Sequence, residues 1–108
     1  MTPKEKSKDR YLYRTYGITI LDFYALTQVY DGRCWRCKRP PKPRKTLCVD
    51  HQHVKNYKKL PPEQKKKYVR GLLDWFCNKY RIGGITDPKE FDVSAEYLRN
   101  TKAQEVLK

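Results

Sequence analysis

Residues 48–53, with the sequence CVDHQH, hold both histidines of the chain beside an aspartate and a cysteine. Together with Thr46 and Leu47, the stretch predicts a short strand that carries these polar side chains to its end. Alternate residues of a strand share a face, so we expect Cys48 and Asp50 on the same side. Two short strands are expected in this part of the chain, and among segments with helical periodicity they predict an α+β fold.

The helical pattern upstream of this strand begins at Thr19. An acid, Asp22, follows three residues later, which predicts a helix start with a capping box. Apolar residues recur at helical spacing as far as residue 27, and Gly32 suits the turn that ends the helix. We expect Tyr16, just before this helix, to pack beneath it; contact with a ligand is the alternative.

Downstream, residues 70–84 (RGLLDWFCNKYRIGG) predict another helix, ended by its two glycines. Leu72, Leu73 and Phe76 would lie on one side of it. A last helix is expected to start near Ser94. The chain is thus expected to have three parts: a flexible basic tail over 1–10, a folded core domain over 11–84 and a helical extension over 85–108.

The chain is strongly basic. Its 108 residues include 25 lysines and arginines against 12 acidic residues, for a formal net charge of +13. This charge attracts polyanions, so nucleic acid is the first expected partner and an anionic membrane surface the second. No apolar stretch is long enough to span a membrane, and no signal-peptide core follows the N-terminus. We therefore expect a cytoplasmic protein whose four cysteines stay reduced and available to metals.

Cysteines with a spacing suited to metal binding lie on both sides of the strand. Cys34 and Cys37 bracket a tight turn, and two thiolates so spaced can hold one side of a tetrahedral zinc ion. Cys77 is the expected third ligand. Asp74 is the expected fourth, because positions 74 and 77 lie on the same face of a helix. Cys48 is an alternative fourth ligand, and buried cysteines without a metal are a third interpretation.

The end of the strand also offers residues suited to phosphodiester cleavage. Such chemistry needs a hard cation held by oxygen ligands, and a base with a pKa near neutrality. Asp50 supplies an oxygen ligand and His51 supplies a base. Asn78, next to Cys77, is a candidate second oxygen ligand. The alternative is that Asp50, His51 and His53 form a turn with exposed polar side chains and no catalytic role.

These motifs, in this order, resemble those of the recombination endonuclease VII family of phage nucleases, which are His-Me finger, or HNH, nucleases. The resemblance covers residues 11–84. It rests on Cys34-x-x-Cys37, Asp50-His51-Gln52-His53, Arg70-Gly71-Leu72-Leu73 and Cys77-Asn78, and on the upstream YGITILDFYALTQVYDGRCWRC. It implies a small ββα-metal core with a zinc knuckle and flanking helices, and a DNA endonuclease with structural Zn²⁺ and catalytic Mg²⁺ or Mn²⁺.

The resemblance also implies a role for each site residue. Asp50 and Asn78 would bind the catalytic ion, His51 would be the general base that activates water, and His53 would position the phosphate. Cleavage would leave a 5′ phosphate. Arg70 would contact the DNA backbone or pair with an acid. The family usually has cysteine where Asp74 stands, so zinc affinity is expected to be lower here.

The stretch between the histidines and Arg70 is longer than is usual for the family and rich in lysine. It is either a solvated loop or an added phosphate-binding element that contributes salt-sensitive affinity without reading bases. The lysines expected to contact DNA are Lys58, Lys59, Lys65, Lys66 and Lys67.

Two other functions fit the same composition. A non-catalytic zinc-bearing nucleic-acid-binding protein explains the charge and the cysteines, but gives no reason for Asp50, His51 and Asn78 to occur together. A structural or assembly protein that binds RNA or a packaging machine is the second rival. Within the nuclease interpretation, a duplex or branched DNA substrate and a monomer or homodimer stay open. A phage-encoded nuclease would act in the cytoplasm of the bacterial host cell.

Overall fold

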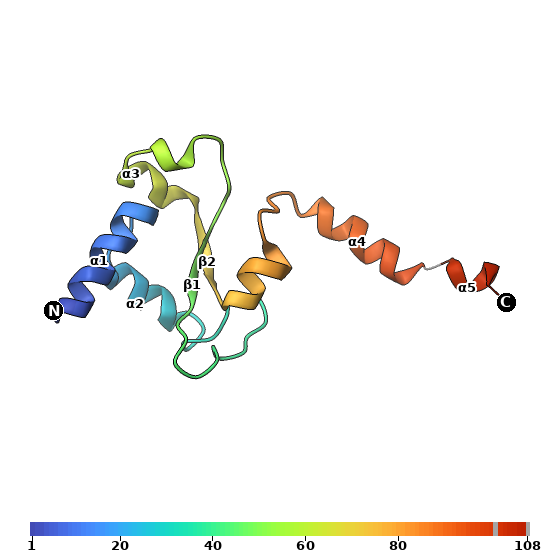
Figure 1. Ribbon diagram of the computed structural model, residues 1–108, viewed down its shortest axis with the longest axis horizontal. Coiled ribbons are helices and arrows are strands. Elements are labelled where there is room, and N and C mark those ends of the chain that lie inside the picture. Colours follow the sequence, from blue (N-terminus) through green and yellow to red (C-terminus); the bar gives the residue numbers. More distant parts are fainter. Residues whose placement is uncertain (101, 108) are drawn as a thin grey trace.

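The computed structural model describes residues 1–100 and 102–107 and combines helices with one small sheet (Figure 1). The helices are α1 (Pro3–Tyr16), α2 (Ile20–Gln28), α3 (Pro62–Lys65), α4 (Lys89–Arg99) and α5 (Ala103–Val106). The strands are β1 (Cys48–His51) and β2 (Val69–Leu73). Shorter helical segments are η1 (Tyr57–Lys59), η2 (Lys66–Tyr68) and the π-helical η3 (Cys77–Ile82). The predicted α+β class is confirmed.

The structure corrects the prediction of a flexible tail over residues 1–10, because α1 begins at Pro3. Thr2 and Glu5 form a capping box in which each side chain accepts a hydrogen bond from the other residue's N–H. Leu12 of α1 is buried, and the Asp9 carboxylate accepts a hydrogen bond of 2.7 Å from the N–H of Ile20. The cap and these contacts together order a segment whose composition alone is too polar to predict a packed helix.

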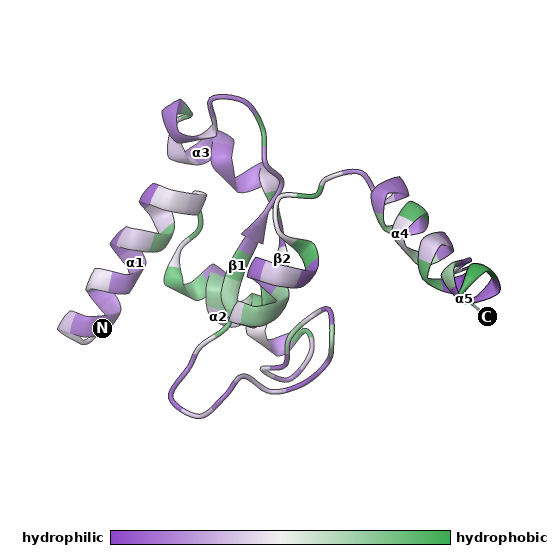
Figure 2. Ribbon diagram, turned by 45° about the vertical axis from the view of Figure 1, so that its right-hand side comes forward, coloured by the Kyte–Doolittle hydropathy of each residue, from purple (hydrophilic) through white to green (hydrophobic). Residues whose placement is uncertain are grey.

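Helix α2 starts where the sequence predicts. The Thr19 hydroxyl accepts a hydrogen bond of 3.1 Å from the N–H of Asp22, whose carboxylate accepts one of 2.9 Å in return. Gly32, with φ of 76°, lies in the turn after the helix. The hydrophobic core lies between α2 and the sheet (Figure 2). Its buried residues are Leu12, Ile18, Ile20, Phe23, Cys34, Leu47, Val49, Leu72, Leu73 and Cys77.

The two strands are antiparallel and their register contains a bulge. Asp50 pairs with Gly71, but the next residue, His51, pairs with Val69, so Arg70 is the extra residue. A bulge of this kind bends the strand and redirects its side chain. The bulge lies opposite the step from Asp50 to His51, the two residues from which the sequence predicted catalysis.

Strand β2 occupies the first part of the segment predicted to be one helix. Leu72 and Leu73 are buried in the sheet, and helical structure starts only after Asp74. Phe76 is exposed, so the predicted common face of these three apolar residues was wrong. A strand buried on both faces reads as an apolar run, which periodicity alone does not distinguish from a helix. We call residues 75–82, which include η3, the site helix.

Trp35 ties the turn between Cys34 and Cys37 to β2. Its backbone N–H donates a hydrogen bond of 2.9 Å to the carbonyl of Leu72. Its indole lies against Gly71, where a Cβ atom would stand 2.5 Å from the ring. The absence of a side chain at Gly71 therefore allows the indole to contact the strand backbone.

The C-terminal end of α1 is held by the segment that precedes β2. The Lys65 ammonium donates a hydrogen bond of 3.0 Å to the carbonyl of Arg14, and the Tyr57 hydroxyl donates one of 2.7 Å to the carbonyl of Thr15. Both acceptors are carbonyls of the last turn, which have no partner within a helix. Gly17, with φ of 74°, ends the helix against α3.

Replacing Gly17 with alanine is expected to destabilise the fold more than the same change at Gly32. Both glycines have left-handed backbone, which costs another residue roughly 1–2 kcal/mol. A Cβ at Gly17 would lie 1.9 Å from the carbonyl oxygen of Pro62, whereas a Cβ at Gly32 meets nothing within 4 Å. In urea unfolding, we expect the free energy of unfolding to fall by about 1 kcal/mol in Gly32→Ala and by at least about 3 kcal/mol in Gly17→Ala. Equal losses would contradict the close packing of α1 on α3.

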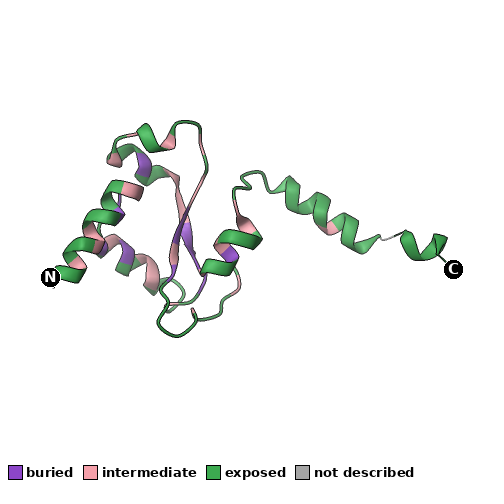
Figure 3. Cartoon of the chain, in the orientation of Figure 1, coloured by how far each residue is buried: buried purple, intermediate pink, exposed green. Residues whose placement is uncertain are grey.

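Helices α4 and α5 extend away from the rest of the chain, and none of their residues is buried (Figure 3). The chain accordingly measures 64 × 34 × 19 Å along its principal axes. Helix α4 starts at Lys89, five residues before the predicted start at Ser94, and follows Pro88 directly. Among the residues described, no helix is long and apolar enough to cross a membrane.

Candidate active site and metal cluster

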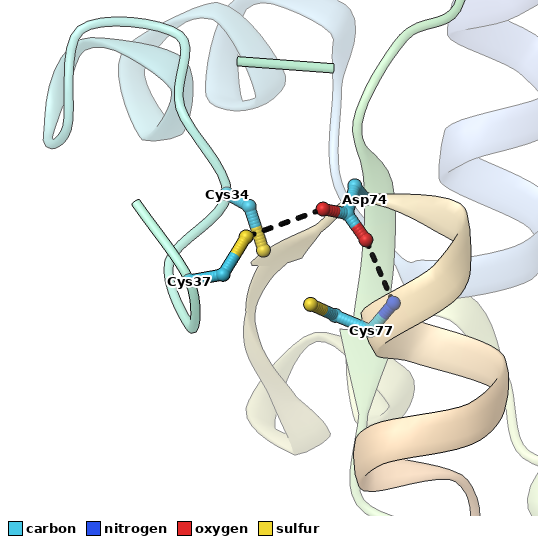
Figure 4. A group of neighbouring side chains, drawn as sticks. All are labelled: Cys34, Cys37, Asp74 and Cys77. Carbon is cyan, nitrogen blue, oxygen red and sulfur yellow. Dashed lines mark hydrogen bonds between the residues drawn. The ribbon is translucent and has the colours of Figure 1, made fainter. Parts of the chain in front are cut away.

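Three cysteines and one aspartate form a cluster at the base of the sheet (Figure 4). Cys34 and Cys37 come from the turn before β1, and Asp74 and Cys77 come from the end of β2 and the site helix. One ligand atom of each residue lies within 4.8 Å of all the others. Tetrahedral ligands of zinc lie about 3.8 Å apart, given bonds of about 2.3 Å, so a contraction of about 1 Å would close the site. The donor set therefore fits a structural zinc ion.

Asp74 is both a helix cap and a candidate ligand. Its Oδ1 accepts a hydrogen bond of 2.7 Å from the N–H of Cys77, and its Oδ2 accepts one of 3.3 Å from the Cys37 thiol. The bond from Cys77 is the main cause that lowers the pKa of Asp74, so the carboxylate is charged at neutral pH. Asp74 was predicted as a ligand because it would share a helix face with Cys77. In the structure it precedes the site helix, so that reason was wrong although the two residues do lie together. Cys48 is not a member of the cluster, so the alternative ligand set is wrong.

The surroundings of the Cys77 thiol in the cluster shift its pKa. Burial raises the pKa of the Cys77 thiol to about 12, and the Arg36 guanidinium, 3.6 Å from its Sγ, opposes this shift. Cys77 is therefore protonated at neutral pH without a metal. An ion binding there would displace the proton, so metal affinity would increase with pH.

A pocket of about 290 Å³ lies at the other end of β1. It brings together His51 and His53 from the strand end and Asn78 from the site helix, although Asn78 is far from both in the sequence. Asn78 directly follows Cys77, so the metal cluster fixes this part of the pocket. The residues that line the pocket are Tyr16, Val49, His51, His53, Asn78, Lys79, Gly83 and Gly84.

His51 lies inside a stack of aromatic rings. Its ring centroid is 4.7 Å from that of His53 at 13° and 4.4 Å from that of Tyr57 at 24°, while Tyr16 is tilted against it at 5.7 Å. Burial is the main cause that lowers the pKa of His51, and the neighbouring His53 lowers it further. The imidazole is therefore held in one orientation and favoured in its neutral form.

Asp50 is paired with Arg70. The guanidinium donates from Nε to Oδ2 at 2.9 Å and from Nη2 to Oδ1 at 3.0 Å, and Nη1 donates to the carbonyl of Ile85 at 3.0 Å. Arg70 is the bulged residue of β2, so the bulge explains how its side chain reaches Asp50. Of the two predicted roles for Arg70, the structure shows the pairing with an acid. A cation bound by Asp50 would have to displace the guanidinium.

Comparison with known proteins identifies the family of the chain. A family model described as recombination endonuclease VII matches residues 9–100. The chain belongs to the recombination endonuclease VII family. The Gene 59 proteins of Mycobacterium phages D29 and L5 are each 39% identical to it over 94 residues, which is 86% of this chain and 50% and 51% of theirs. The chain thus spans about half the length of the curated relatives it matches, and no solved structure matches it.

The lysine-rich stretch of this endonuclease VII family member divides into two kinds of residue. Lys65 is buried and bonded to α1, so its predicted contact with DNA is corrected to a structural role. The side chains of the other predicted lysines are exposed and remain candidates for phosphate contact. They are Lys58, Lys59, Lys66 and Lys67.

Sequence reasoning missed three residues around the pocket of this family member. For Tyr16, packing was preferred over contact with a ligand. Tyr57 gave no signal in the sequence, because its contact with His51 depends on long-range folding. Lys79 had a signal, since it is a cation next to Asn78 in the sequence. It lines the pocket with Asn78, so it is the added candidate for contact with a phosphate.

Proposed function

We propose that this family member is a divalent-metal-dependent DNA endonuclease that hydrolyses phosphodiester bonds in duplex or branched DNA. The observation that carries the proposal is the shared pocket of His51, His53 and Asn78, in which the lowered pKa of His51 favours the form that accepts a proton. The net charge of +13 suits a polyanionic substrate. A non-catalytic DNA-binding protein would use the charge and the cluster but would not need this pocket.

In the proposed reaction, the scissile phosphate enters the pocket and His51 accepts a proton from a water molecule. The water oxygen attacks phosphorus while the bond to the 3′ oxygen breaks. The 3′ oxygen takes up a proton, so the products are a 3′ hydroxyl and a 5′ phosphate. His53 and Lys79 line the same pocket, where they would orient the phosphate and offset its charge.

Mg²⁺ or Mn²⁺ completes the proposal, with Asp50 and Asn78 as the protein ligands. In the structure Asp50 lines a second pocket beside Arg70, whereas Asn78 lines the pocket of the histidines, so the ion would have to bring the two residues together. Carboxylate and amide oxygens are the donors that these hard cations prefer. Because Arg70 occupies both oxygens of Asp50, ion binding there requires that Arg70 release the carboxylate. The ion would neutralise charge at the phosphate and the leaving oxygen.

Nicking of supercoiled plasmid by the zinc-loaded protein tests the proposal. We expect open-circular product with Mg²⁺ or Mn²⁺ and none without an added divalent ion, and DNA ligase should reseal the nick because it carries a 5′ phosphate and a 3′ hydroxyl. Plasmid binding without nicking in any divalent ion would favour the non-catalytic rival. Matched linear, nicked and four-way DNA would separate a duplex substrate from a branched one.

The proposed setting is the cytoplasm of an infected bacterium, since the relatives come from phages. Cutting two opposed strands at a junction would require a homodimer. Sedimentation with and without four-way DNA tests this part of the proposal separately from cleavage.

Cleavage is expected to increase with pH through an inflection below 6.5, the ordinary pKa of histidine. The base must be neutral, and a lowered pKa keeps it neutral at lower pH. Replacing His53 with alanine should raise the pKa of His51, because the electrostatic effect of His53, which lowers that pKa, is removed. Proton NMR titration of the zinc-loaded protein without Mg²⁺ measures this directly, since the variant has only one histidine. A His51 pKa at or above 6.5 in the unmodified chain would contradict the expectation.

A further inference from the structure

The outer side of the site helix carries a cluster of exposed aromatic rings. Trp75, Phe76 and Tyr80 are 55%, 48% and 58% exposed. The ring of Tyr80 lies 5.5 Å from Trp75, edge to face, and 5.3 Å from Phe76. Single exposed aromatics are common, but three rings joined through Tyr80 form a patch that marks an interaction site. We call these three residues the aromatic patch.

Cations lie over the rings of the aromatic patch. The Lys79 ammonium is 5.0 Å from the Trp75 centroid and 5.5 Å from that of Tyr80, and the Arg81 guanidinium is 4.9 Å from that of Phe76. Aromatic faces combined with lysine and arginine match nucleotides, in which a base with two π-faces is joined to a phosphate. An apolar protein partner would have to desolvate these charges.

The aromatic patch and the candidate active site lie on the same helix, and Lys79 contacts both. Cys77 and Asn78 face the metal cluster and the pocket, whereas the aromatic patch faces solvent. Lys79 connects the two, since it lines the pocket and its ammonium lies over two rings of the patch. A DNA strand whose phosphate enters the pocket would therefore have a neighbouring nucleotide beside the patch.

We propose that the aromatic patch binds unpaired DNA bases next to the phosphate in the pocket. The inference rests on the proposed function, since it assigns part of the substrate to this helix. A base would replace the cation over a ring, and the displaced cation would contact the phosphate of the same nucleotide. Paired bases present no free face, so the patch favours DNA that is unpaired near the cleaved bond.

Tryptophan fluorescence tests the proposal without cleavage. Zinc-loaded protein, without added Mg²⁺, is titrated with a thymidine dodecamer, an abasic strand of the same length and a fully paired duplex. We expect the dodecamer to quench Trp75, while the abasic strand and the duplex bind through phosphates with little quenching. Trp35 supplies a constant background, because its indole nitrogen is buried. Equal quenching by the abasic strand would overturn the proposal. Quenching that depends on protein concentration and not on DNA would also overturn it, because it indicates that a second copy of the chain covers the patch.

Variants separate stacking from folding. Tyr80→Ala and Trp75→Ala should weaken dodecamer binding about 5- to 100-fold, measured by anisotropy of a labelled strand, and leave binding to the abasic strand unchanged. Trp75→Phe should retain most of the affinity, and Tyr97→Ala, at an exposed ring on α4, should retain all of it. Melting temperature and zinc content serve as folding controls. Unchanged affinity in folded Trp75→Ala and Tyr80→Ala would overturn the proposal, whether or not the protein cleaves DNA.

Discussion

Replacing His51 with alanine should reduce the rate of plasmid nicking by at least about 10²- to 10⁴-fold, the contribution usual for a general base. The imidazole is the group in the pocket whose pKa and orientation suit proton transfer from water. Its ring stacks on Tyr57 and His53 but is only half-buried and lies outside the hydrophobic core, so the variant should still fold. Initial nicking rates at saturating Mg²⁺ provide the measurement.

A neighbouring residue provides the matched control for His51. Gln52 lies between the two histidines but is not among the residues that line the pocket. Gln52→Ala should therefore cleave at nearly the rate of the unmodified protein. Both variants should bind plasmid and melt near the unmodified protein. A His51→Ala variant that nicks at full rate would remove His51 as the base.

Replacing Cys34 with serine should abolish stoichiometric zinc binding and destabilise the fold by at least about 3 kcal/mol, or roughly 12 °C in melting temperature. Cys34 is fully buried, and its cluster joins the turn before β1 to the site helix. A structural zinc ion contributes about 10–16 kcal/mol of binding free energy in small domains, which is comparable to the whole stability of such a fold. Zinc per chain by mass spectrometry and thermal unfolding provide the measurements.

Cys48 offers the control for the cluster, because it is a half-buried cysteine outside it. Cys48→Ser should keep one zinc per chain and lose little stability. Loss of zinc in Cys48→Ser, with retention in Cys34→Ser, would contradict the ligand set. The same pair of variants separates a metal effect from the general cost of changing a cysteine.

Local signals in the sequence predicted part of this fold correctly. Thr19 and Asp22 fixed the start of α2, and the Cys-x-x-Cys spacing led to the right cluster. The error over residues 70–84 came from a strand buried on both faces, where Leu72 and Leu73 fit either periodicity. Sequence patterns describe residues that are close together along the chain. Predictions from them are therefore correct where a structure depends on residues three or four positions apart.

The site was less predictable because its contacts are long-range. The pairing of Arg70 with Asp50 depends on a bulge, and the role of Lys65 depends on the position of a helix about fifty residues earlier. Neither bulge nor burial is visible in residue spacing. Asn78 was a candidate because it follows Cys77, whose position the metal cluster explains, and because the resemblance to the family implied it.

The attachment of α1 has a practical consequence for handling the protein. Tyr16 forms one wall of the pocket, and the carbonyls of Arg14 and Thr15 hold Lys65 and Tyr57. Trimming the first seventeen residues to obtain a smaller crystallisation target would therefore open this pocket. It would also release the ring of Tyr57, which stacks on the imidazole of His51. Affinity tags belong ahead of Thr2, joined by a spacer that leaves the capping box free to form.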